Sequence, residues 1–175
     1  MMKSPDKDTS WDWLQNGDRK AFGNFYRQHA ASLHRFVRRC VGDPKATEDI
    51  VQETFLQLWQ HPNGFNPARG PLRVYLFGIA ARRSADWWRH RPPETELNPG
   101  RPASQTNLPM LVEDAFEKLD SDSRSLLWLR EVEGYSYQEL AEMLAIPVGT
   151  VRSRLYTARE RLRRVWKGEQ TTEAL

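Results

Sequence analysis

Basic side chains are concentrated in two short segments of this 175-residue chain, and both segments have the chemistry to bind a polyanion. Residues 149–167 hold seven Lys and Arg residues against one acid, and residues 69–91 hold six Arg residues against one Asp. The net charge is only +3, since residues 112–145 hold nine acids and three bases. One basic run is typical of a solvated helix face, whereas two runs beside aromatic or helix-capping residues indicate two contacts with nucleic acid.

The other residues that could carry chemistry lack suitable partners. Glu48, Asp49 and Glu53 could suggest a metal site, but the four histidines are scattered along the chain. Cys40 is the only cysteine, and we expect it to be a helix packing residue because no histidine partner can be assigned to it. We therefore expect no catalytic residue, no metal and no cofactor. A helical nuclease or phosphohydrolase that uses the three carboxylates is the enzyme-class alternative.

The bulk composition favours a protein of the cell interior. A single cysteine excludes an internal disulfide and is typical of a reducing compartment. No apolar run approaches the length of a membrane span, and the first residues lack the apolar stretch of a signal peptide. We expect a cytoplasmic location without membrane insertion.

Hydrophobic periodicity predicts an all-α fold, because apolar residues recur at steps of three and four and no alternating β-branched run occurs. A first helix is expected from about residue 18 until Gly42, and Asp43 with Pro44 should begin a second helix that ends near Gln60. A third helix is expected over about residues 72–91. Trp11 and Trp13 are expected in a short N-terminal helix that packs on this first block.

A proline-rich segment divides the chain into two small helical domains. Residues 92–109 hold five of the eleven prolines, a composition typical of a flexible linker that buries no core. The expected organisation is an N-terminal extension (1–17), a first domain (18–92), the linker (93–109), a second domain (110–167) and a tail (168–175).

The second domain has the layout of a helix-turn-helix. After a helix over about residues 110–119, Ser121 or Asp122 could cap a helix that ends at Gly134, and Ser136 with Glu139 forms a capping box for a short helix. A longer helix follows over about residues 149–166. Its apolar residues fall on one stripe, and Arg152, Ser153 and Tyr156 point away from that stripe, as a helix that reads a major groove requires. An ordinary amphipathic hairpin would explain the stripe but not the concentration of bases.

Three segments resemble the sigma factors of the extracytoplasmic-function (ECF) group, which belongs to the bacterial sigma-70 family. Residues 148–155 (VGTVRSRL) resemble the promoter-reading helix of the group, and residues 49–59 (DIVQETFLQLW) resemble its polymerase-docking helix. Residues 65–80 (FNPARGPLRVYLFGIA) resemble its loop and helix for the promoter −10 element. The segments occur in the order of the family, and the resemblance covers about residues 18–167.

The resemblance implies partners and roles. The partners would be core RNA polymerase, through the β′ clamp helices and the β flap, promoter DNA and an anti-sigma factor. Three residues would meet the clamp helices: Asp49, Gln52 and Glu53. Four loop residues would surround an unstacked base of the −10 strand: Asn66, Pro67, Ala68 and Arg69. Six residues would line the DNA backbone and the upstream duplex edge: Arg82, Arg83, Trp87, Trp88, Arg89 and Arg91.

The last helix would read the −35 element. Arg152, Ser153 and Tyr156 would face the bases, Arg154 and Arg159 would hold phosphates, and Thr150 would belong to the same DNA-binding set. The sequence departs from the family at Arg82, near which an asparagine is common, and at Thr157, where a basic residue is frequent. These departures imply more backbone contact at −10 and lighter reading at −35. The binding-class alternative is a stand-alone helix-turn-helix regulator that binds a palindromic operator as a dimer.

Overall fold

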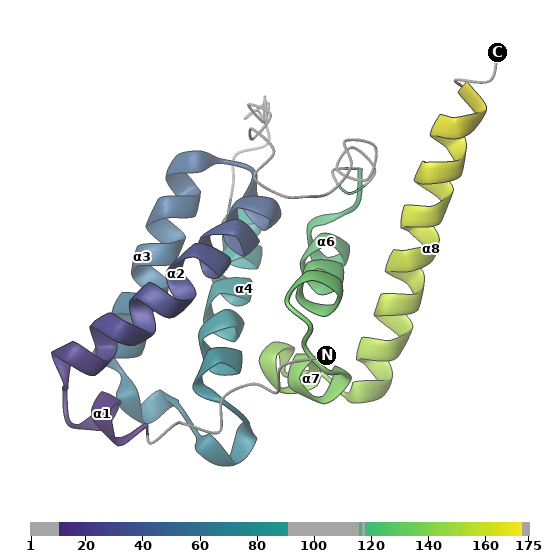
Figure 1. Ribbon diagram of the computed structural model, residues 1–175. Helices are drawn as coiled ribbons and strands as arrows, with labels where there is room; N and C mark the ends of the chain where they lie inside the picture. The colour runs from purple at the N-terminus through teal and green to yellow at the C-terminus, as the bar shows by residue number, and fades with distance from the viewer. Residues whose placement is uncertain (1–10, 91–115, 117, 173–175) are drawn as a thin grey trace.

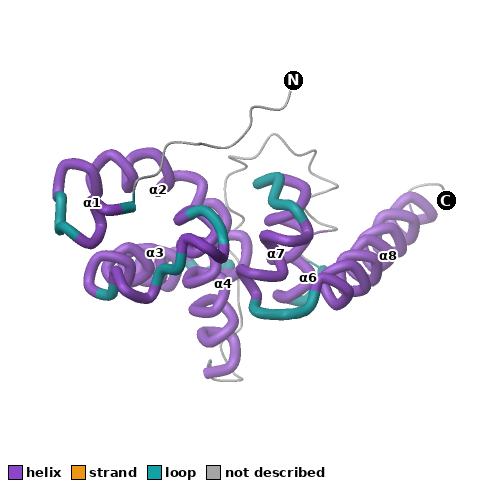
Figure 2. The backbone as a smooth tube through the Cα atoms, turned by 90° about the horizontal axis from the view of Figure 1, so that it is seen from below, coloured by secondary structure: helices purple, strands orange, loops and turns teal. Residues whose placement is uncertain are grey.

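The computed structural model describes residues 11–90, 116 and 118–172 of the chain, and this part is helical without a β-strand, as predicted. The helices form two regions that lie side by side (Figures 1 and 2). The first region consists of α1 (Asp12–Gln15), α2 (Arg19–Val41), α3 (Pro44–Gln60), the 3₁₀ turns η1 (Pro62–Gly64) and η2 (Pro67–Arg69), and α4 (Leu72–His90). The second region consists of α6 (Ser121–Leu127), the π-helical turn η3 (Trp128–Val132), α7 (Tyr137–Leu144) and α8 (Val148–Thr172).

Local capping signals set the helix ends of the first region. The Asp18 carboxylate accepts hydrogen bonds from the backbone of Lys20 and Ala21 at 2.9 and 3.0 Å, and α2 begins there. Gly42 ends α2 with φ +82°, a left-handed conformation that glycine adopts at no steric cost. Asp43 then caps α3 by accepting from Ala46 N at 2.6 Å. The predicted ends of α2, α3 and α4 are confirmed.

Aromatic contacts attach α1 to the rest of the first region. The Trp11 ring lies 5.8 Å from that of Phe65, and Trp13 lies 5.6 Å from Phe25. Phe65 in turn packs on Tyr75 of α4 at 5.8 Å, so that the loop before α4 is anchored from two sides. The predicted short N-terminal helix is confirmed.

The N-cap of α6 lies one residue before the nearer of the two predicted caps. Asp120 is the N-cap of α6 and accepts from Ser123 N at 2.9 Å, so the expectation of Ser121 or Asp122 is wrong. The predicted capping box of α7 is present: Ser136 accepts from Glu139 N at 3.1 Å, and Glu139 accepts from Ser136 N at 2.7 Å. The predicted linker and most of the helix predicted over residues 110–119 lie outside the described residues.

The last helix is longer than predicted, because α8 continues past Gly168 to Thr172. A lone glycine lowers helix stability by only about 1 kcal/mol, and no proline follows it. Figure 1 shows the C-terminal half of α8 projecting away from the other helices. Among the described residues, no helix combines the length and apolar character that a membrane crossing requires.

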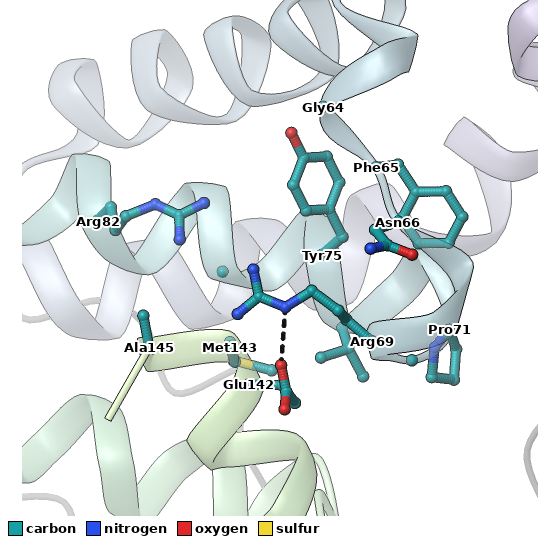
Figure 3. Close-up of a pocket in the computed structure, with 13 residues that line it drawn as sticks. Gly64, Phe65, Asn66, Arg69, Pro71, Tyr75, Arg82, Glu142, Met143 and Ala145 are labelled. Carbon is teal, nitrogen blue, oxygen red and sulfur yellow. Dashed lines mark hydrogen bonds and ion pairs between the residues drawn. The ribbon is translucent and has the colours of Figure 1, made fainter. Parts of the chain in front are cut away.

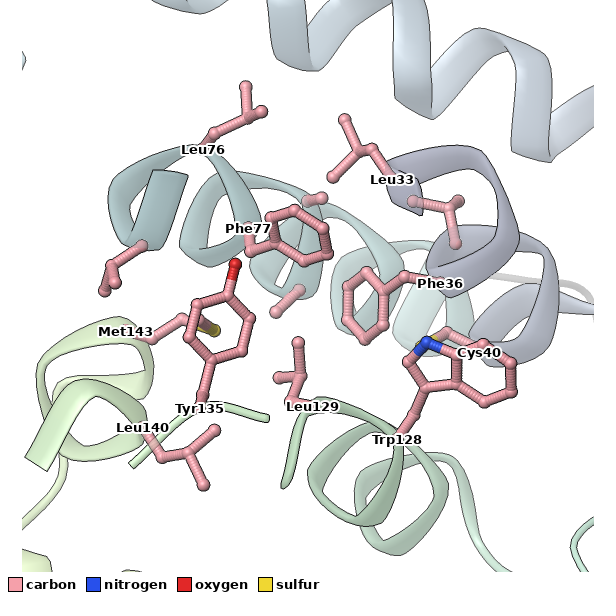
Figure 4. Packing of buried hydrophobic residues seen from close by; sticks show 14 of the residues in the cluster. Leu33, Phe36, Cys40, Leu76, Phe77, Trp128, Leu129, Tyr135, Leu140 and Met143 are labelled. Atoms are coloured by element: carbon pink, nitrogen blue, oxygen red, sulfur yellow. The ribbon is translucent and has the colours of Figure 1, made fainter. Parts of the chain in front are cut away.

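The two regions share one hydrophobic core, which the sequence did not predict. Phe36 and Phe77 from the first region pack against Trp128, Leu129 and Tyr135 from the second (Figure 4). All five side chains are at most 2% exposed. The π-helical turn η3, with Glu133 N donating to Trp128 O at 3.1 Å, lies in the segment that presents Trp128 and Leu129 to this core.

Candidate nucleic-acid interface

The loop before α4 forms one wall of a pocket of about 300 Å³ (Figure 3). Asn66, Arg69 and Arg82 all line this pocket, although the loop and α4 separate them in sequence. Asn66 also holds the loop in shape, because its side-chain oxygen accepts from Ala68 N at 3.0 Å and so begins the turn η2. Pro67 and Ala68 are exposed on this turn but do not line the pocket. The structure thus brings together three of the residues assigned to the −10 strand.

The remaining residues assigned to −10 are more dispersed. Arg83 does not line this pocket: it donates to the side-chain oxygen of Gln57 on α3 at 3.0 Å and pairs with Glu53. Arg89 pairs with Asp86 on the exposed end of α4. Arg91 lies outside the described residues. Arg83 therefore links α4 to α3, the predicted docking helix.

The two tryptophans near the end of α4 are both half-buried. The Trp88 indole donates to the Cys40 carbonyl oxygen at 2.8 Å, and the rings of Trp87 and Trp88 meet edge to face at 5.1 Å. Trp88 consequently ties the end of α4 to the end of α2. The Cys40 side chain is fully buried, as expected of a packing residue.

The predicted docking residues lie on one exposed face of α3. Asp49, Gln52 and Glu53 are exposed, while the opposite side of the helix is buried in the core. Leu56, which the sequence analysis did not select, extends this face and is 51% exposed. Positions 49, 52, 53 and 56 are spaced by three and four residues, so they lie on the same face of the helix. The sequence could have indicated Leu56, because it is an apolar residue that does not belong to the buried stripe. This face combines carboxylates, an amide and one aliphatic side chain.

The helix-turn-helix presents the predicted groove-facing residues to solvent. Val151, Leu155 and Ala158 are buried, and Arg152, Ser153, Arg154 and Tyr156 are exposed on the other side of α8. Tyr156 is 67% exposed, an unusual value for an aromatic side chain without a partner surface. Thr150, at half burial, accepts from the Ser153 hydroxyl through its carbonyl oxygen at 3.0 Å.

Ion pairs within the second region neutralise part of the basic helix. Arg159 donates to Glu131 of η3 at 2.6 Å, and Arg161 pairs with Asp120. Hydrogen bonding to Glu131 raises the pKa of Arg159 further above its ordinary value. Arg152 and Arg154 lie on the exposed side of α8 and are the basic residues nearest its N-terminus.

The site contains no arrangement suited to metal chemistry in the part of the chain that is described, where no three His, Cys, Asp or Glu side chains gather closely enough to hold an ion. A pocket lined by basic side chains and an exposed basic helix that follows a short helix and a turn are instead typical of a DNA-binding protein of the helix-turn-helix class.

Comparison with known proteins identifies the family. Residues 25–92 match Sigma-70 region 2, and residues 110–162 match Sigma-70, region 4. The chain is 36% identical over 151 residues to the ECF RNA polymerase sigma factor SigL of Mycobacterium tuberculosis, with 79% of this chain and 84% of the relative covered. It is 31% identical over 172 residues to the ECF RNA polymerase sigma-E factor of Salmonella typhimurium, with 84% and 87% covered.

Two solved structures are similar in fold. One is CnrH in complex with the cytosolic domain of CnrY, with a TM-score of 0.70, 28% identity and coverage of 90% of this chain and 95% of that chain. The other is the sigma factor RpoE in complex with the anti-sigma factor NepR from Bartonella quintana, with a TM-score of 0.69, 25% identity and coverage of 85% and 98%.

The chain belongs to the ECF group of the sigma-70 family. It is a promoter-specificity subunit, which binds core RNA polymerase and directs transcription initiation at promoter DNA. The comparisons support this function and not that of a stand-alone helix-turn-helix regulator.

Proposed function

We propose that the exposed face of α3 is the surface that docks on the β′ clamp helices of core RNA polymerase. The face contains Asp49, Gln52, Glu53 and Leu56. Exposed carboxylates and an amide can pair with arginines of a partner helix, and an exposed aliphatic side chain loses its water on docking. The Arg83 side chain, which holds Glu53 and Gln57, fixes this face relative to α4.

The pocket between the loop and α4 captures one base of the −10 non-template strand. The observation that carries this proposal is the convergence of Asn66, Arg69 and Arg82 on one pocket. An unstacked base needs an enclosed space with polar groups at its edges, and guanidinium groups can hold the neighbouring phosphates. Pro67 and Ala68 form the rim of the loop, and Trp87, Trp88, Arg89 and Arg91 border the duplex upstream.

The exposed side of α8 reads the −35 element. Arg152, Ser153 and Tyr156 face the bases from the first turns of the helix, where recognition helices touch base edges. Thr150 supports Ser153, and Arg154 and Arg159 hold phosphates. The acidic helices before the turn face the β flap of the polymerase.

The functional division of the chain is at residues 18–92 for docking and −10 capture and 110–167 for −35 reading. The polymerase performs the chemistry, and this chain contributes no catalytic group of its own. It acts in the cytoplasm, where its polymerase partner is, and its one cysteine suits that reducing compartment. An anti-sigma protein restrains it, a proposal supported by the similar RpoE in complex with the anti-sigma factor NepR.

In vitro transcription with bacterial core RNA polymerase over a random promoter library tests these assignments. The native chain should enrich templates with a defined −35 and −10 pair. Arg82→Ala should weaken selection at −10 alone, and Arg152→Ala should weaken selection at −35 alone. Loss of both preferences with either variant would contradict the division of labour.

A further inference from the structure

The C-terminal half of α8 projects from the molecule and carries basic side chains (Figure 1). The helix runs to Thr172, past residue 162, where the match to Sigma-70, region 4 ends. Arg163, Arg164 and Lys167 lie in this part of α8, and all three are exposed. The family match therefore covers none of these three residues.

Two of these residues continue the side of α8 that carries the proposed DNA-reading residues. An α-helix turns by about 100° for each residue, so side chains three, four, seven or eight positions apart share a side. A group of side chains, which we call the basic stripe, lies within about 80° around the helix axis on this spacing. The basic stripe consists of Arg152, Tyr156, Arg159, Arg163 and Lys167. Arg164 points about 120° away from Arg152 and is outside the stripe.

The acidic side chains of the second region pair with α8 before the end of the stripe. Glu131 of η3 accepts from Arg159, and Asp120 pairs with Arg161. Arg163, whose side chain is 68% exposed, pairs instead with Glu160 of its own helix. An exposed pair between neighbouring turns contributes little free energy, so a phosphate can replace Glu160 as the partner of Arg163.

The spacing along the stripe suits a DNA backbone. Recognition helices contact base edges near their N-terminus and can contact the backbone toward their C-terminal end. Arg159 is proposed to hold a phosphate, and Arg163 and Lys167 lie about 6 Å and about 12 Å further along the helix axis. A DNA strand carries a phosphate about every 3.4 Å along the duplex, so each of these side chains can meet a phosphate of its own.

We propose that Arg163 and Lys167 form a second contact of α8 with duplex DNA, on phosphates that flank the −35 element. This contact rests on the proposed function, in which the same side of α8 reads that element. It adds affinity without adding specificity, because a phosphate contact carries no sequence information. The basic stripe thus reads bases with its first turns and holds the flanking backbone with its later turns.

The salt dependence of DNA binding by the full-length chain tests this contact. Arg163→Gln and Lys167→Gln each remove one positive charge and introduce a residue that favours helix. Each variant should bind a mixed-sequence duplex about three- to eightfold more weakly at about 0.1 M salt, and the slope of log affinity against log salt should become shallower by about 0.9. Fluorescence anisotropy over a salt series measures both quantities.

Arg164→Gln is the matched control, because it removes the same charge from the same part of α8 but outside the basic stripe. Positive charge near a helix C-terminus also stabilises the helix, and circular dichroism should show whether the three variants keep the native helix content. A native slope in both Arg163→Gln and Lys167→Gln would overturn the proposal. An equal change of slope in Arg164→Gln would also overturn it, since net charge alone would then explain the effect.

Duplexes that differ in their flanks locate the contact. The selected −35 element is placed in a duplex with flanking DNA on one side, on the other side or on neither. The native chain should gain affinity from one of the two flanks, and Arg163→Gln and Lys167→Gln should gain less from that flank. An equal gain in the native chain and both variants would refute the contact. Weaker association of both variants with core RNA polymerase without DNA, at an unchanged salt slope, would assign the two residues to an acidic protein surface instead.

This contact and the proposed function can fail separately. If library transcription shows no −35 preference but the two variants have shallower salt slopes than Arg164→Gln, the phosphate contact stands and the assignment of −35 reading falls. If Arg152→Ala relaxes the −35 preference while Arg163→Gln and Lys167→Gln keep the native slope, −35 reading stands and the phosphate contact falls.

Discussion

Arg159 donates two hydrogen bonds to one oxygen of Glu131, from Nη2 at 2.6 Å and from Nε at 3.2 Å. Arg159 lies on the basic helix α8, and Glu131 lies on η3 of the acidic segment before it. The acidic segment thus contacts the basic helix directly. If Arg159 holds a DNA phosphate, as proposed above, that phosphate must compete with this carboxylate.

Removing the charge of Glu131 should strengthen DNA binding. Glu131→Gln keeps an oxygen beside Arg159 but frees the guanidinium for phosphate, so affinity for mixed-sequence duplex should rise about three- to fivefold at low salt, the scale of an exposed ion pair. The slope of log affinity against log salt should steepen by about 0.9. Fluorescence anisotropy over a salt series measures both. Glu48→Gln, an exposed acid on α3, has the same charge change, and an equal gain there would mean that only net charge matters.

Most helix boundaries of the first region could be predicted because each of them is marked by residues with a strong local preference for a helix end. Gly42 is the glycine that ends α2, and Asp43 with Pro44 begins α3. The start of α6 was harder to predict, since Asp120, Ser121 and Asp122 are all good capping residues. The burial of Leu126 and Leu127 against neighbouring helices decides at which of these residues α6 begins. A local sequence pattern does not contain that information.

The sequence predicted which residues of the candidate site are exposed, but it did not predict which residues from other helices they contact. The exposure of Arg152, Ser153 and Tyr156 follows from the apolar stripe of α8. The contact between Gly78 and Met143 does not, because a glycine inside an apolar helix pattern indicates a close approach without naming the partner. Similarly, nothing local in the sequence pairs Arg83 with Gln57 and Glu53 of α3.

Leu56 should be a major contact with the polymerase. Leu56→Ser removes the exposed aliphatic side chain of the docking face, so association with core RNA polymerase should weaken by about 1–2 kcal/mol, or roughly five- to thirtyfold. The free energy of unfolding should change by less than about 0.5 kcal/mol because the residue is 51% exposed. Tyr156→Ser removes an exposed side chain from the DNA-reading side of α8 instead, and it is the control when association is measured without DNA. Equal losses of affinity in the two variants would remove Leu56 from the docking face.

Arg152 should read one base of the −35 element. Arg152→Ala should cost about 1–3 kcal/mol on the preferred promoter and relax the preference at a single position, as expected for a bidentate contact with guanine. Arg154→Ala should weaken all sequences by a similar factor, since a phosphate contact carries no sequence information. Competition binding with single-base variants of the selected −35 element separates the two outcomes. A uniform loss with Arg152→Ala would reassign that residue to the phosphate backbone.

The Asn66 side chain has two roles that an experiment must distinguish: it holds the shape of the loop, and we propose that it contacts the captured base. Its side-chain oxygen accepts from Ala68 N, so its amide NH2 group is what remains to donate to a base. Asn66→Ser keeps an oxygen that can cap the turn, whereas Asn66→Ala removes both functions.

Both Asn66 variants should lower initiation on a duplex promoter and on a template melted in advance at −10, because capture fails in each case. Asn66→Ala should also lower the free energy of unfolding by up to about 1 kcal/mol, while Asn66→Ser should leave it within about 0.3 kcal/mol. Urea unfolding and single-round transcription measure the two effects. If Asn66→Ser initiates as well as the native chain, the side chain serves only the loop, and Arg69 with Arg82 must hold the strand.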